Sequence, residues 1–141
     1  MNGAKGLLVS VLCLSSGLLA AQSHHSQWKK VYERDLTDFE LSPEGSELVL
    51  LAQPQRRCRM DVDFYGEMGQ DKYRYEFTRD RLTAGLYREY RYTVASLSEV
   101  TRDNIKLVRN EKLNPASAAV KKEFQDIYQY IPNKVLKKYC F

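Results

Sequence analysis

The chain has 141 residues, with 22 Lys or Arg against 18 Asp or Glu, so its formal net charge is only +4. An excess this small does not indicate nucleic-acid binding, which shows itself as a dense Lys/Arg stripe on one face. This charge is compatible with an acidic protein or the anionic cell envelope as a partner, and equally with a role in solubility alone. No internal repeat, low-complexity segment or linker divides the chain, which predicts a single domain.

The first 21 residues have the order of a secretory signal peptide. Lys5 supplies a positive charge, residues 7–14 are almost continuously apolar, and small residues precede a polar stretch. The apolar run is too short to span a membrane, which needs about 20 apolar residues, so we expect no stable insertion after cleavage. Cleavage is expected near Ala20 to Ser23. The mature domain, residues 22–141, is then expected in the periplasm.

Two cysteines remain after cleavage, because Cys13 leaves with the signal peptide. An even number of cysteines in an oxidising compartment pairs by default, which predicts a disulfide between Cys58 and Cys140. Such a bond closes most of the mature chain into one loop and contributes on the order of 4 kcal/mol in the chain-entropy model.

The mature chain begins with the spacing of an amphipathic helix, which is predicted to start near Ser26. Residues 42–45 then break the pattern, and the apolar run at residues 47–52 predicts a buried strand. The apolar residues that carry the helical spacing are Trp28, Val31, Tyr32, Leu36 and Phe39.

Alternation of polar and apolar residues marks the middle of the chain. Residues 59–64 and 72–77 have the period of half-buried strands, and the loop Gly66–Asp71 between them suits a hairpin. A third strand is predicted at residues 87–94, and three strands in a row indicate an antiparallel meander. Residues 105–108 are too few to separate strand from helix, and we favour a fourth strand.

A C-terminal helix follows, with Asn114 as its cap, Pro115 at its start and Pro132 at its end. The predicted fold class is therefore α+β. It is an antiparallel meander of three to four strands packed with an N-terminal and a C-terminal helix and held by one disulfide.

The sequence contains no pattern typical of a catalytic site. The two histidines, His24 and His25, stand at the new amino terminus, so no base is predicted beside a Ser or Cys nucleophile. Asp61 and Asp63 share a strand face, but their arginine neighbours favour a solvated pattern over a glycosidase pair. We expect no enzyme activity, cofactor or metal site. Cleavage after Ala21 would, however, make His24 the third residue of the mature chain, and a histidine at this position can chelate Cu(II) or Ni(II) together with the free amino terminus.

Tyrosine and arginine interleave along the predicted strands, and both residue types dominate protein-binding hot spots. Tyrosines that alternate along the strands are expected in the core, whereas arginines in or near connections are better candidates for a partner. The hairpin loop is a second candidate surface. The predicted partner-binding residues are Arg79, Arg81, Arg88, Glu67, Gln70 and Asp71.

In length, export signal and cysteine pair, the whole chain resembles the periplasmic immunity proteins that protect bacteriocin-producing cells from their own toxin. The resemblance implies a non-catalytic protein whose partner is a muramidase-type, pesticin-like bacteriocin. An arginine or a loop would then occupy the acidic cleft of the enzyme. The alternatives are an inhibitor of host lysozyme or of another secreted effector, and a non-catalytic envelope assembly factor.

Overall fold

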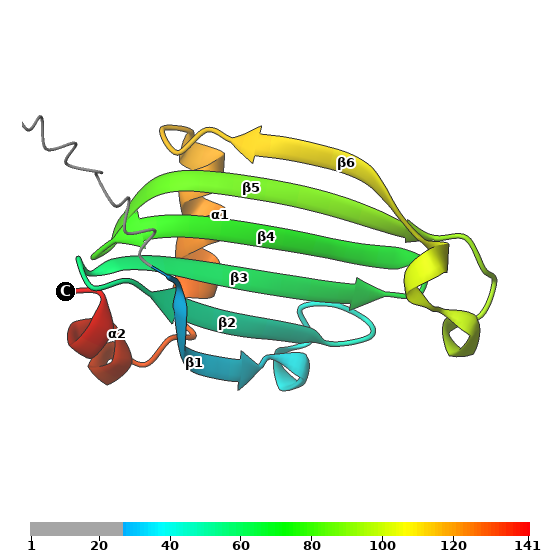
Figure 1. The fold of residues 1–141 in the computed structure, drawn as a ribbon, viewed down its shortest axis with the longest axis horizontal. Coiled ribbons are helices and arrows are strands. Elements are labelled where there is room, and N and C mark those ends of the chain that lie inside the picture. Colours follow the sequence, from blue (N-terminus) through cyan, green and yellow to red (C-terminus); the bar gives the residue numbers. More distant parts are fainter. Residues whose placement is uncertain (1–26) are drawn as a thin grey trace, which may run out of the picture.

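The structure is a computed structural model that describes residues 27–141, so the predicted signal peptide lies outside the described residues. The described chain forms one six-stranded antiparallel sheet in which each strand pairs with the next in sequence (Figure 1). The strands are β1 (Lys29–Asp35), β2 (Ser46–Ala52), β3 (Arg57–Gly66), β4 (Gly69–Thr78), β5 (Arg81–Tyr92) and β6 (Ile105–Leu113).

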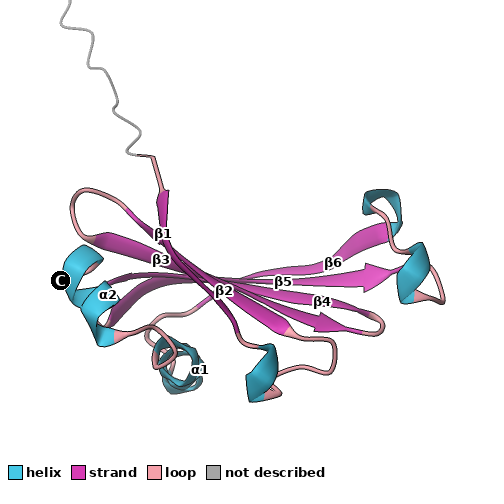
Figure 2. Ribbon diagram, turned by 90° about the horizontal axis from the view of Figure 1, so that it is seen from below, coloured by secondary structure: helices cyan, strands magenta, loops and turns pink. Residues whose placement is uncertain are grey.

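Two α-helices follow the sheet in the described chain, α1 (Ala118–Tyr128) and α2 (Asn133–Tyr139). Three short 3-10 turns lie in the connections: η1 (Thr37–Phe39), η2 (Leu97–Glu99) and η3 (Arg102–Asn104). Both α-helices pack against the same face of the sheet, so the opposite face has no helix over it (Figure 2).

The core lies between this covered face and the helices. Phe124 of α1 packs on Tyr75 and Phe77 of β4, with ring centroids 5.7 and 5.3 Å apart. Alternate residues of β2 and β3 complete the core, since side chains two apart along a strand share a face. These residues are 8% exposed or less: Leu48, Leu50, Ala52, Cys58, Met60 and Val62.

The predicted disulfide is confirmed: Cys58 of β3 is bonded to Cys140, 82 residues further along the chain. The residue after α2 is thereby fixed to the covered face of the sheet. The backbone N–H of Arg79, in the turn between β4 and β5, also donates to the carbonyl oxygen of Cys140 at 3.2 Å. The C-terminal end of the chain is therefore fastened to two neighbouring parts of the sheet.

The α+β class, the antiparallel meander and the C-terminal helical region agree with the sequence, but the sheet has six strands rather than three to four. The predicted N-terminal helix is wrong, because β1 and η1 occupy its place. A β-bulge at Val31 lets both Val31 and Tyr32 pack against the core, which breaks the alternation of a strand. Pairing with β2 then outweighs the helical spacing of the apolar residues.

The hairpin between β3 and β4 is confirmed, but its connection is shorter than predicted. Gly66 pairs with Gly69, so Glu67 and Met68 alone form the turn. A side chain at Gly69 would place its Cβ 2.0 Å from the carbonyl oxygen of Tyr90, which explains the glycine at this position.

Candidate functional site

The strongest candidate site lies on the helix-free face of the sheet, called here the open face. A hollow of about 310 Å³ in this face has a floor of Val49, Leu51 and Leu86. Val49 and Leu51 alternate with the core residues of β2, because this strand is apolar on both faces. Six charged residues surround the floor: Glu47, Asp61, Asp63, Lys72, Arg74 and Arg88.

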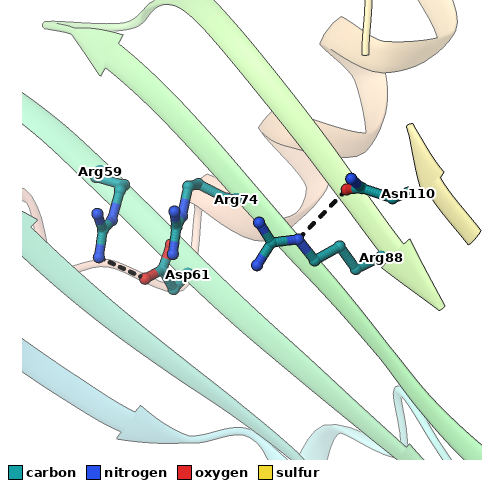
Figure 3. A network of polar contacts seen from close by, with 5 residues as sticks. All are labelled: Arg59, Asp61, Arg74, Arg88 and Asn110. Carbon is teal, nitrogen blue, oxygen red and sulfur yellow. Dashed lines mark hydrogen bonds and ion pairs between the residues drawn. The ribbon is translucent and has the colours of Figure 1, made fainter. Parts of the chain in front are cut away.

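Ion pairs between β3 and β4 organise the centre of the open face. Asp61 accepts hydrogen bonds from Arg59 Nη2 at 2.9 Å and from Arg74 Nε at 3.0 Å (Figure 3). Asp63 is paired in the same way with Lys72, the residue directly opposite it. Both aspartates are therefore neutralised in ion pairs, an arrangement that stabilises the pairing of the two strands.

Arg88 differs from the other cations of this hollow. Its Nε donates to the side-chain oxygen of Asn110 on β6 at 3.3 Å, and within residues 27–141 it forms no ion pair. Figure 3 shows its guanidinium lying between Arg74 and Asn110. The half-buried Arg88 thus presents a positive charge that no carboxylate compensates, held in place by a neutral amide.

An arginine–tryptophan stack extends the network toward the start of the described chain. The guanidinium of Arg59 lies 5.2 Å and that of Arg57 lies 5.9 Å from the centre of the Trp28 ring. In such cation–π contacts the electrostatic potential of the ring face attracts the guanidinium groups. Because Trp28 is the single tryptophan of the chain, its fluorescence reports on this part of the open face.

A corner of the open face holds a pair of carboxyl groups, Glu33 of β1 and Glu47 of β2. The hydrogen bond that Glu47 forms with Glu33, together with partial burial, raises the pKa of Glu47, whereas the hydrogen bond donated by Lys30 lowers the pKa of Glu33. Burial, together with the neighbouring charges of Asp63 and Glu47, also raises the pKa of Tyr65 to about 12. On acidification Glu47 therefore takes up a proton before Glu33 does.

The structure separates the three predicted arginines. Arg79 lies in the turn between β4 and β5, where its backbone contacts Cys140 after α2, and Arg81 is the first residue of β5; both are exposed. Arg88 lies in the middle of β5, directly opposite Lys72 on the open face. Arg88 and the Arg79–Arg81 turn therefore belong to two different surfaces.

The three predicted hairpin residues lie at the opposite end of β4 from Arg79. Glu67 is exposed in the turn, whereas Gln70 and Asp71 belong to β4 itself. Asp71 accepts a hydrogen bond from the hydroxyl of Tyr87 at 2.8 Å, which gives its carboxylate a structural role. The six predicted residues thus do not form one surface.

Sequence reasoning missed Trp28 and the Arg59–Asp61–Arg74 network as parts of one site. The alternation of charged residues in residues 59–63 and 72–76 was the available signal, but the pairing register that opposes Asp61 to Arg74 appears only in the fold.

Comparisons of the chain with protein-family models, with curated proteins and with solved structures found no match. No helix of the described residues is long and apolar enough to cross a membrane. The same residues contain no group of three or more His, Cys, Asp or Glu arranged to hold a metal ion.

Proposed function

We propose that this chain is a periplasmic immunity protein that binds a muramidase-type, pesticin-like bacteriocin and blocks its substrate cleft. The observation that carries the proposal is the uncompensated guanidinium of Arg88, in a hollow whose other cations are ion-paired. The signal-peptide pattern and the disulfide fit a protein that works where peptidoglycan is cut.

A muramidase cleft offers the complementary chemistry, because its catalysis depends on carboxyl groups that flank the scissile bond. A carboxylate that approaches Arg88 can form a charge-assisted pair, which is about twice as strong as a neutral hydrogen bond. Neither partner then carries a buried uncompensated charge. The enzyme loses access to its substrate without any reaction of the inhibitor.

Two features around Arg88 should add to the affinity for a partner beyond charge attraction. Arg88 stands on β5, between β6 and β4, and two ion pairs join β4 to β3, so the backbone that carries Arg88 loses little conformational entropy on binding. Val49, Leu51 and Leu86 supply apolar area beneath it. A fixed arginine over apolar contacts is a common composition of a hot spot.

The test is a protection assay in bacteria that are sensitive to pesticin. Cells express either the whole chain or a chain without residues 1–21, and both are challenged with purified pesticin. Survival with the whole chain alone supports a periplasmic immunity protein. Equal killing of both cultures contradicts the proposal and makes host lysozyme the next enzyme to test, since its cleft also holds two carboxyl groups.

A further inference from the structure

Charge is separated along the strands of the described chain. One end of the sheet, called here the basic end, consists of the first residue of β1, of β3 and of β5, the β2–β3 and β4–β5 turns, and α2 with the residues around it (Figure 1). Asp80 is the single acidic side chain of these segments. Their cations are all exposed: Lys29, Arg56, Arg57, Arg79, Arg81, Lys134, Lys137 and Lys138.

Contacts bring these cations to one surface. Lys29, Arg56 and Lys138 line the same hollow, although they come from three different elements. Arg79 is placed beside them by the hydrogen bond of its backbone to Cys140. Arg57 is ion-paired with Glu76, whereas the other seven cations form no ion pair within residues 27–141.

The opposite end of the sheet, called here the acidic end, has the reverse charge. It consists of residues 35–45, the β3–β4 turn and the β5–β6 connection, in which Arg102 is the single cation. Seven exposed carboxylates face solvent there: Asp35, Asp38, Glu40, Glu44, Glu67, Glu99 and Asp103. The described domain is therefore an electric dipole directed along its strands.

We infer that the basic end docks on the anionic phospholipid headgroups of a membrane surface. Each cation close to an anionic leaflet adds to the attraction, and seven uncompensated cations act together here. Four of the seven are lysines, whose strongly hydrated ammonium groups suit a wet headgroup layer and are depleted in protein interfaces. The end is built from turns and a helix tip, with half-buried Tyr139 beside Lys138.

The dipole also sets the orientation of the bound protein. An anionic surface attracts the basic end and repels the acidic end, so the strands stand away from the membrane. The open face with Arg88 then remains accessible from the side. This inference does not depend on the identity of the protein that Arg88 contacts.

The test uses the chain purified from the periplasm of expressing cells and sedimentation with lipid vesicles. We expect binding to vesicles of phosphatidylglycerol and phosphatidylcholine at about 0.05 M salt, no binding to phosphatidylcholine alone, and release at about 0.5 M salt. The variant Lys134→Glu/Lys137→Glu/Lys138→Glu should lower the partition coefficient by at least about 100-fold. A control with the same charge change, Arg102→Glu/Lys106→Glu/Lys121→Glu, should change it much less.

Absence of binding to the anionic vesicles overturns the inference, as does an equal loss in both triple variants. Inhibition of pesticin is measured in parallel, and the α2 triple variant should retain it. If that variant loses inhibition but still binds vesicles, the basic end belongs to a protein interface and the lipid inference is wrong. The two proposals therefore fail separately.

Discussion

Lys72 on β4 and Arg88 on β5 lie directly opposite each other, yet within the described chain Lys72 alone of the two has a carboxylate partner. Lys72 is paired with Asp63, whereas Arg88 donates to the neutral side chain of Asn110. Like charges opposite each other on a sheet are destabilising. We therefore interpret Arg88 as a residue that binds a partner protein and slightly lowers the free energy of unfolding.

Replacing Arg88 with Gln should leave the fold intact and raise the free energy of unfolding by up to about 0.5 kcal/mol, because the repulsion from Lys72 is removed. Replacing Arg74 with Gln should lower the same quantity by up to about 1 kcal/mol, because the ion pair with Asp61 is lost. Urea unfolding measures both changes. A loss above about 1 kcal/mol for Arg88→Gln would show that this residue is structural.

The bond between Cys58 and Cys140 should stabilise the domain strongly, since it closes a long loop. The variant Cys58→Ser/Cys140→Ser is expected to lose on the order of 4 kcal/mol, measured by urea unfolding under oxidising conditions. The native chain under reducing conditions serves as the matched control and should lose a similar amount. An unchanged unfolding midpoint in both experiments would refute this role of the disulfide.

Two tyrosine hydroxyls with different surroundings form a matched pair of tests. The Tyr75 side chain is fully buried and its hydroxyl has no hydrogen-bond partner among the described residues, so Tyr75→Phe should keep or raise stability by up to about 1 kcal/mol. The Tyr87 hydroxyl donates to Asp71, so Tyr87→Phe should lower stability by about 1 kcal/mol. In thermal unfolding the midpoint should therefore fall for Tyr87→Phe and should not fall for Tyr75→Phe.

The Glu33–Glu47 corner predicts a pH-dependent stability. Because the pKa of Glu47 is raised in the fold, its contribution is present below its ordinary pKa of 4.5 and is lost as pH rises through the raised value. Glu47→Gln should thus unfold at a higher temperature than the native chain at about pH 7, with little difference at about pH 3. The same midpoint for both proteins at neutral pH would contradict this sign.

The control for that experiment is Glu33→Gln. The pKa of Glu33 is lowered, first by Lys30, so its contribution is present at neutral pH and is lost on acidification. The two substitutions should therefore shift the midpoint at neutral pH in opposite directions.

The regular parts of the fold could be predicted, whereas an irregular strand could not. Residues 59–64 and 72–77 alternate cleanly and form the central strands β3 and β4. In β1 the bulge at Val31 removes the alternation, and the remaining apolar spacing matches a helix. Local pattern alone does not contain the pairing partner that decides between the two structures.

The candidate site was predictable only in part for a related reason. Arg88 is among the predicted partner-binding residues, but its special state depends on Lys72 and Asn110, which come from the two neighbouring strands. The pairing register between β3 and β4 decides which basic side chain pairs with each aspartate of β3. Arg79 and Arg81 were predicted from their place in a connection, and the fold puts them at a different surface.

The most direct test of the central claim is calorimetric titration of purified pesticin with three forms of the chain: native, Arg88→Glu, and Arg79→Glu/Arg81→Glu. Matching circular dichroism spectra and urea midpoints establish first that all three are folded. We expect Arg88→Glu to weaken binding by about 100-fold or more, as charge reversal at a hot spot does, and the double variant to change affinity by less than about fivefold. Native affinity for Arg88→Glu would show that Arg88 does not contact pesticin, and a larger loss for the double variant would place the binding surface at the basic end.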